Sequence, residues 1–206
     1  MDIAGSIWSF AAVVALLTLT PGLDTALILR TSLLAGRRPA WGVTLGIQLG
    51  TLIWGVLTAA GLSALLAASQ LAYDILRWAG AAYLVWMGLR MLLAKAGAES
   101  VQEHQTVGFR KGFTRGLVTN LLNPKVGAFY VAMLPQFIPA EAPHAAMGLL
   151  LAGVHVAEGL VWSVLLIGFA SLMSGFLRSP GVHRFLDRLT GVVIVGFGVR
   201  LALTTD

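Results

Sequence analysis

The sequence predicts an all-α polytopic membrane protein with six transmembrane helices, arranged as two inverted repeats of three helices. Three observations predict this class: a low charge content, long apolar runs, and similarity between the two halves. Of the 206 residues, 57% are hydrophobic and 11% are charged, whereas soluble domains carry charge at about 25% of positions. The mean hydropathy is +0.84. Too few charged side chains remain to cover the surface of a water-soluble globule.

The first three spans are expected at residues 7–34, 41–68 and 75–94. Each reaches the length of about 20 apolar residues that a helix needs to cross the hydrocarbon core. Arg77 and Arg90 lie about one turn inside the two ends of the third span, from where their long side chains reach the headgroups. These two charges therefore do not interrupt the span.

The last three spans are expected at residues 113–138, 145–172 and 189–204. Between the two halves lies a polar stretch, residues 95–111, without the apolar periodicity that builds a core. We interpret it as a flexible cytoplasmic loop. The whole chain then forms a single transmembrane domain, with repeat 1 at about residues 1–94 and repeat 2 at about residues 112–206.

The basic residues predict the orientation of the chain. Eleven of the 14 Lys and Arg residues lie in or beside the connections that follow spans one, three and five. Only Arg77 and Arg200 lie toward the other side, and Lys125 is inside a span. The positive-inside rule then places both termini outside the cytoplasm. Because these charges report topology, the net charge of +5 predicts no nucleic-acid partner.

The two halves align through rare residues in a consistent order. The aligned pairs are Pro21 with Pro124, Gln48 with His155, Thr51 with Glu158 and Arg90 with Arg200. Three spans per half is an odd number, so the second copy must enter the membrane from the opposite face. Inverted repeats of this kind are common in secondary transporters, whose substrate sites lie near the midplane where helices of both repeats are interrupted.

Three formal charges lie well inside the predicted spans: Asp24, Lys125 and Glu158. Each costs about 2.5–3.5 kcal/mol at a helix centre on insertion scales, so we expect them to face a shared cavity or one another. In the functional interpretation, Asp24 receives an ammonium group or a proton and Lys125 attracts a carboxylate. In the alternative interpretation, the two side chains form a permanent ion pair and only neutralise each other.

Other polar residues surround these charges. The candidate substrate-binding residues are Asp24, Lys125, Thr20, Pro21, Gly22, Asn120, Asn123 and Pro124, and the candidate proton-coupling or pore-lining residues are Asp24, His155, Glu158, Gln48 and Thr51. Each proline removes a backbone donor, so the nearby hydroxyls and amides serve equally well to satisfy carbonyls that the prolines release. A metal site needs more ligands than His155 and Glu158 supply, and no metal or other cofactor is expected. No HExxH, GxSxG or P-loop motif occurs, and no enzymatic activity is expected.

Three segments of the sequence carry a family resemblance. Thr20-Pro21-Gly22 in the first span, Asn123-Pro124-Lys125 in the fourth and the run at residues 74–84 resemble the lysine exporter (LysE/RhtB) family of bacterial amino-acid exporters. The resemblance implies six spans, export from the cytoplasm and coupling to the proton-motive force. A common continuation of the first motif is T-P-G-P-N, whereas this chain has Leu23 and Asp24, so the resemblance does not narrow the substrate.

The sequence therefore predicts a proton-coupled secondary exporter of amino acids or close derivatives that works by alternating access. Its expected partners are a small zwitterionic substrate, protons and the lipid bilayer, and the sequence is compatible with a homo-oligomer. Two alternatives stay open: a metal-cation transporter that uses Asp24, His155 and Glu158, and a scaffold subunit that transports nothing.

Overall fold

The structure is a computed structural model that describes residues 2–68, 70–93, 108–139, 141–172, 176 and 179–203. Every regular element in these ranges is helical, which confirms the all-α class. In chain order they are α1 (Ile3–Leu19), α2 (Leu23–Ala35), α3 (Arg37–Ala68), α4 (Gln70–Leu93), α5 (Phe109–Leu121), α6 (Pro124–Ala128), η1 (Phe129–Met133), η2 (Leu134–Phe137), α7 (His144–Gly168) and α9 (Pro180–Leu203). Most of the predicted loop at 95–111 lies outside the described residues.

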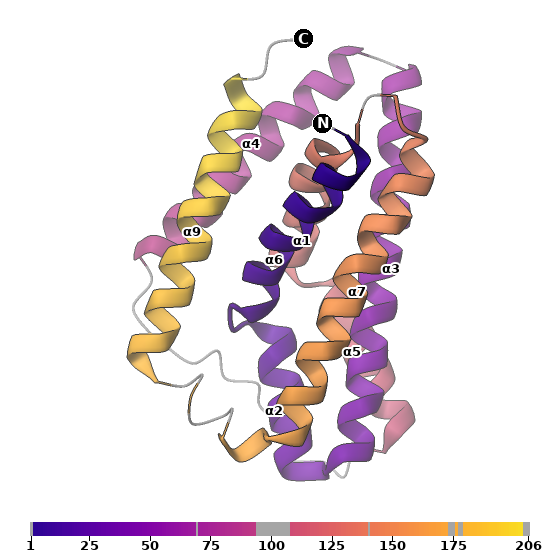
Figure 1. Ribbon diagram of the computed structural model, residues 1–206. Coiled ribbons are helices and arrows are strands. Elements are labelled where there is room, and N and C mark those ends of the chain that lie inside the picture. Colours follow the sequence, from indigo (N-terminus) through magenta and orange to yellow (C-terminus); the bar gives the residue numbers. More distant parts are fainter. Residues whose placement is uncertain are drawn as a thin grey trace.

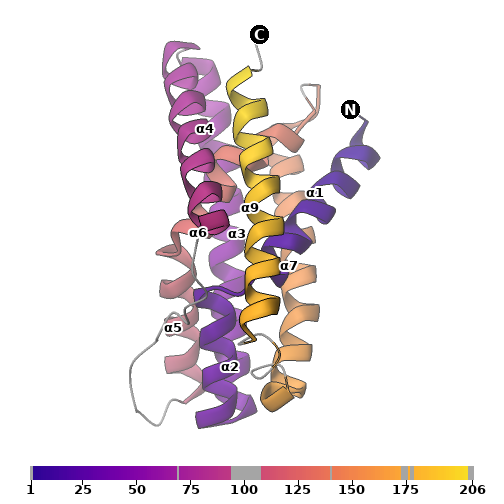
Figure 2. The same cartoon turned by 90° about the vertical axis from the view of Figure 1, so that its left-hand side faces the viewer.

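The helices form an elongated bundle with the two termini at the same end (Figures 1 and 2). Helix α3 packs against α2, α5 and α7, and α4 pairs lengthwise with α9. Helix α1 packs against α7. Its C-terminal end lies near the middle of the bundle, and α2 continues from there toward the opposite end (Figure 1). The chain thus runs back and forth along the long axis of the bundle, as a polytopic membrane protein does.

The first predicted span is broken where the sequence places its proline. Helices α1 and α2 are bent by 53° relative to each other. Thr20 and Gly22 have extended backbone angles at the end of α1 and the start of α2. Pro21 has no N–H to continue the helix, and its ring clashes with the preceding turn. The predicted interruption is therefore confirmed at Pro21.

The fourth predicted span is also broken at its proline. Helix α5 ends at Leu121, and Asn123 caps α6 by accepting a hydrogen bond from the backbone N–H of Lys125 at 3.1 Å. Pro124 occupies the first helical position of α6, where a missing N–H costs nothing. The chain then continues through the π-helical turns of η1 and the 3₁₀ turn of η2. Both predicted interruptions exist, one in each half of the chain.

Several helices extend beyond the predicted spans. Helix α4 begins at Gln70 rather than residue 75, α5 at Phe109 rather than residue 113, and α9 at Pro180 rather than residue 189. The predicted boundaries followed hydropathy, which marks hydrocarbon rather than helix. Polar and basic turns continue a helix into the headgroup region, where long side chains reach water.

Two of the described helices, α3 and α7, contain a stretch long and apolar enough to cross a membrane, and the bent pair α1 and α2 adds a third candidate. The six-span arrangement is therefore only partly supported by length and composition.

Helices α3 and α5 approach closely through glycines. A Cβ atom at Gly46 would meet the carbonyl oxygen of Phe113 and lie 2.7 Å from the backbone nitrogen of Leu117. A Cβ atom at Gly116 would meet the carbonyl oxygen of Val43. Both surfaces of this contact consist of backbone atoms, so no flexible side chain could move aside for a Cβ atom at either glycine. Small residues of this kind let membrane helices approach at short distance.

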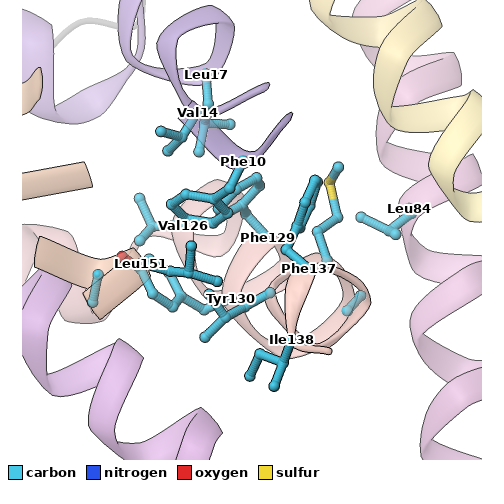
Figure 3. Close-up of a cluster of buried hydrophobic side chains, with 14 of the residues drawn as sticks. Phe10, Val14, Leu17, Leu84, Val126, Phe129, Tyr130, Phe137, Ile138 and Leu151 are labelled. Carbon is cyan, nitrogen blue, oxygen red and sulfur yellow. The ribbon is translucent and has the colours of Figure 1, made fainter. Parts of the chain in front are cut away.

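An aromatic cluster holds the irregular part of the fourth span in place. Phe10 of α1 packs against Phe129 and Phe137, with ring centroids 5.8 and 5.4 Å away, and all three side chains are buried. Figure 3 shows these rings gathered around the turns of η1 and η2. Close packing on all sides compensates for the weaker hydrogen-bond geometry of the 3₁₀ and π-helical turns.

Candidate functional site

A polar cavity of about 70 Å³ lies where the two broken spans meet. It has room for a few water molecules, each of which needs about 10–15 Å³ of such a cavity. Its walls come from the break between α1 and α2, from α3, from the break between α5 and α6, and from α7. The lining residues are Leu17, Thr18, Thr20, Gly22, Asp24, Thr25, Ile28, Ile47, Gln48, Thr51, Asn120, Asn123, Lys125, Val126, His155, Gly159, Trp162 and Ser163.

Lys125 connects the two breaks. Its Nζ donates hydrogen bonds to the carbonyl oxygens of Leu17 at 3.0 Å and Thr20 at 2.9 Å. In a continuous helix the Leu17 carbonyl would accept from the N–H four residues later, but that residue is Pro21. The ammonium therefore replaces the donor that the proline lacks. It also lies at the C-terminus of α1, where the helix dipole favours a cation.

Asp24 lies in the first turn of α2, where the helix dipole favours an anion. Its Oδ2 accepts a hydrogen bond from Asn120 Nδ2 at 2.9 Å. The side-chain amide of Asn123 also acts on this carboxylate as a hydrogen-bond donor, and the ammonium of Lys125 acts on it through its charge. The other oxygen, Oδ1, is buried and has no hydrogen-bond partner among the described residues. A buried acceptor without a donor is costly, so this oxygen is the least satisfied charged atom of the cavity wall.

Asn120 is held from two sides. Its Nδ2 also reaches Thr51 Oγ1 at 3.4 Å, and its amide packs on Gly50, where a Cβ atom would lie 2.5 Å from Asn120 Oδ1. Its backbone carbonyl is the one that Pro124 leaves without the usual helical donor. That oxygen accepts the backbone N–H of Asn123 at 3.1 Å instead, and Trp54 Nε1 lies 3.4 Å from it, at the long end of the hydrogen-bond range. Gly50 therefore makes room for the amide that orients Asp24.

The opposite wall of the cavity belongs to α7. His155 is 8% exposed, and its Nδ1 shares a hydrogen bond of 3.1 Å with the hydroxyl of Tyr130, which is fully buried. The two rings stack with an interplanar angle of 9°. Since Nδ1 is occupied, Nε2 is the nitrogen that remains for a ligand. One turn further along α7, Gly159 contacts the amide of Gln48 from α3, and a Cβ atom there would lie 2.6 Å from Gln48 Nε2.

The structure brings most of the predicted site residues together. Those that line the cavity are Thr20, Gly22, Asp24, Gln48, Thr51, Asn120, Asn123, Lys125 and His155. Pro21 and Pro124 are not among the lining residues, and they act through the carbonyls that they release. Glu158 is also absent from the lining, and its Oε2 is buried without a hydrogen-bond partner among the described residues. Thr20 Oγ1 instead faces away toward Thr190 Oγ1 and the carbonyl of Leu16.

Sequence reasoning missed several residues of the site. Gly159, Trp162 and Ser163 follow His155 at helical spacing on α7, so the periodicity of that face could have identified them. Tyr130 could not be found in this way, because its contact with His155 joins two separate spans. No group of three or more His, Asp or Glu side chains suited to a metal lies within the described ranges. The metal-cation alternative therefore gains no support from the geometry.

Comparison with known proteins agrees with this architecture. The sequence matches the family described as LysE type translocator over residues 15–205. The chain belongs to this family. LysE type translocators are membrane transport proteins and not enzymes. The expectation of a membrane transporter without enzymatic activity and the resemblance to the lysine exporter family are therefore confirmed.

Among relatives of the chain is the homoserine/homoserine lactone efflux protein of Salmonella typhimurium, which is 34% identical over 95% of this chain and 96% of its own length. An uncharacterized membrane protein of Vibrio cholerae is 30% identical over 90% of each chain. The uncharacterized membrane protein YrhP of Bacillus subtilis is 25% identical over 97% of this chain and 99% of its own length. No solved structure matches the sequence.

Proposed function

We propose that this LysE-family translocator exports small amino acids or their close derivatives from the cytoplasm. The observation that carries the proposal is the cavity between the two broken spans, with the buried carboxylate of Asp24 in its wall. Interrupted helices near the midplane form the substrate sites of many secondary transporters. The efflux relatives, named for homoserine and its lactone, support a substrate of this size and chemistry.

The same arrangement supports alternating access between two inverted repeats. Helices α4 and α9 make reciprocal contacts: a Cβ atom at Gly88 would meet Val195 at 2.6 Å, and one at Gly198 would meet Val85 at 2.9 Å. The offset of 110 residues that aligns Arg90 with Arg200 also aligns Val85 with Val195 and Gly88 with Gly198. Exchange of these aligned residues turns one contact into the other. A two-fold axis in the membrane plane produces such pairs, which favours six spans in two repeats that rock against each other.

Proton coupling is assigned to the ionisable groups near the cavity. Asp24 and His155 both line it, and Glu158 lies one turn beyond His155 on α7. Intramembrane carboxylates and histidines commonly form proton relays in transporters. A scaffold subunit would need no cavity that reaches Asp24, so the cavity argues against that alternative.

Reconstitution into proteoliposomes tests the proposal. An imposed proton gradient should drive movement of homoserine or another small neutral amino acid, and Asp24→Asn should abolish it while the protein still purifies as a folded monodisperse species. Gradient-driven transport by Asp24→Asn at the wild-type rate would refute the site assignment. Absence of transport across a panel of amino acids would refute the proposed function.

The orientation is tested separately. We propose an inner-membrane location, as in the bacterial exporters that the chain resembles. We also propose that both termini lie outside the cytoplasm, because Arg37 and Arg38 begin α3, directly after its connection to α2. The connection between α2 and α3 and the start of α7 lie at opposite ends of the bundle (Figure 1). Reporter fusions at Gly36, between α2 and α3, and at Ala142, just before α7, should report the cytoplasm and the outside, respectively. The reverse result would overturn the orientation.

A further inference from the structure

The two charges of the cavity differ in how far the protein already satisfies them. Lys125 donates two hydrogen bonds to backbone carbonyls of the first span. An ammonium group has three donors, so at least two of them are used by the protein before any ligand arrives. These bonds are charge-assisted, and such bonds are shorter and stronger than neutral ones.

The bonds of Lys125 also have a structural task. The Leu17 carbonyl has lost its helical donor to Pro21, and in a bilayer a released carbonyl needs a partner from protein, water or ligand. If Lys125 turned toward a ligand carboxylate, it would leave the Leu17 and Thr20 oxygens unsatisfied. The gain from a new contact would be offset by the loss of two existing ones, so the ammonium is a poor anchor for a ligand.

Asp24 is in the opposite situation. One carboxylate oxygen is held by Asn120, while Oδ1 is buried and lacks a donor in the part of the chain that the structure describes. A ligand that brings an N–H donor to this oxygen removes a desolvation penalty and gains a charge-assisted hydrogen bond. A ligand that brings a carboxylate meets a second negative charge instead.

We infer that the cavity selects its ligand by the ammonium group, through Asp24, and that Lys125 is a positioning residue that makes no contact with the ligand carboxylate. The ligands are then primary amines of amino-acid size, whether their carboxyl group is free or converted to a neutral amide. This inference rests on the proposed export of amino acids, and it replaces the simpler assumption that an acid and an amine grasp the two ends of a zwitterion.

A set of matched ligands tests the inference on the unmodified protein. Homoserine, alanine and leucine are each compared with their carboxamides and their N-acetyl derivatives, in binding to detergent-purified protein and in counterflow from proteoliposomes. Acetylation should weaken binding at least about tenfold, because it removes the charge that Asp24 recognises. Amidation should change binding by less than about threefold, since no ionic contact is lost.

The outcomes separate the inference from the proposed function. Binding of the free amino acids with a tenfold or larger loss for the carboxamides would overturn the inference and leave the export function standing. Equal binding of the acetylated and free forms would overturn it as well. Failure of every ligand to bind or move would overturn the inference and the proposed function together.

Two variants add an independent readout. In Lys125→Met, which keeps the length of the side chain and removes its charge, the ratio of homoserine to homoserinamide affinity should stay within about twofold of the wild-type ratio, while the melting temperature falls. In Asp24→Asn, the factor by which N-acetylation weakens ligand binding should approach one. A homoserine-to-homoserinamide ratio that collapses in Lys125→Met would show that the lysine contacts the carboxylate, and would refute the inference.

Discussion

Gly50 controls the position of Asn120, and through it the carboxylate of Asp24. In Gly50→Ala, the new Cβ atom would lie 2.5 Å from Asn120 Oδ1, 3.0 Å from its Cγ and 3.1 Å from its Cβ, whereas ordinary contact begins at 3.4 Å. The amide must therefore withdraw by about 0.9 Å at its oxygen. A shift of that size takes Asn120 Nδ2 out of hydrogen-bond range of Asp24 Oδ2, which it now meets at 2.9 Å.

The expected cost follows from these contacts. Overpacking a close-packed interface costs about 1–3 kcal/mol, and loss of a hydrogen bond to a charged group costs about 1.5–3 kcal/mol. The higher helix propensity of alanine offsets about 0.5–1 kcal/mol of this loss of stability. A net loss of about 3.5 kcal/mol corresponds to a fall of roughly 7–14 °C in melting temperature for a chain of this size. Transport should fall more than tenfold, because Asp24 loses the group that orients it.

Gly153→Ala is the matched control, since a Cβ atom at this helical glycine would meet nothing within 4 Å. It should keep transport and leave the melting temperature equal or slightly higher. Differential scanning fluorimetry in detergent and transport in proteoliposomes provide the two readouts. The double variant Gly50→Ala with Asn120→Ala should lose much less stability relative to Asn120→Ala than Gly50→Ala loses relative to the wild type, because the amide is gone and only the 3.1 Å contact with the Cβ atom of residue 120 remains. Additive losses in the double variant, or wild-type behaviour of Gly50→Ala, would refute the reasoning.

Three further predictions concern the breaks and the cavity wall. Pro21→Ala restores the N–H that the Leu17 carbonyl lacks, so melting temperature should hold or rise while transport falls, and unchanged transport would contradict a role for the break. Gly46→Ala forces backbone of α3 against backbone of α5, and should lower the yield of folded protein more than Gly50→Ala does, as measured by size-exclusion chromatography. Tyr130→Phe leaves Nδ1 of His155 without its hydroxyl partner and should cost about 1–2 kcal/mol of unfolding free energy, with Tyr83→Phe as a control on a partly exposed ring.

The positions of the two breaks were predictable from the sequence, because a proline acts on its own helix. The missing N–H of Pro21 and of Pro124 disrupts a hydrogen bond whatever surrounds it, and α1 and α5 end beside these residues. The ends of α4, α5 and α9 were predicted less well. Helix continues wherever backbone hydrogen bonds are satisfied, and at the membrane surface water or side chains satisfy them without an apolar sequence.

The contacts of the site were predictable only in part. Charge and polarity inside an apolar span indicated that Asp24, Lys125 and His155 would face a cavity, since lipid contact is too costly for them. Which partner each would choose depends on distances between spans. The contact from Lys125 to Leu17 joins residues more than one hundred positions apart, and that from Tyr130 to His155 depends on the irregular turns of η1. Neither follows from spacing along one helix.

In each repeat the proline leaves one backbone carbonyl without its helical N–H donor, and a different donor replaces it in each repeat. Pro21 releases the carbonyl of Leu17 and Pro124 releases that of Asn120, each four residues before its proline, so the two carbonyls occupy equivalent positions in the two halves. Lys125 Nζ satisfies the first at 3.0 Å. The second accepts the backbone N–H of Asn123 at 3.1 Å, and Trp54 Nε1 adds a longer contact at 3.4 Å. A charged side chain from the other repeat thus satisfies the carbonyl of repeat 1, whereas a backbone donor next to the break satisfies that of repeat 2. Because the carbonyl of repeat 2 keeps its backbone donor when Trp54 is replaced, Trp54→Phe should lower the melting temperature less than Lys125→Met does. An equal or larger loss in Trp54→Phe would contradict this assignment of donors.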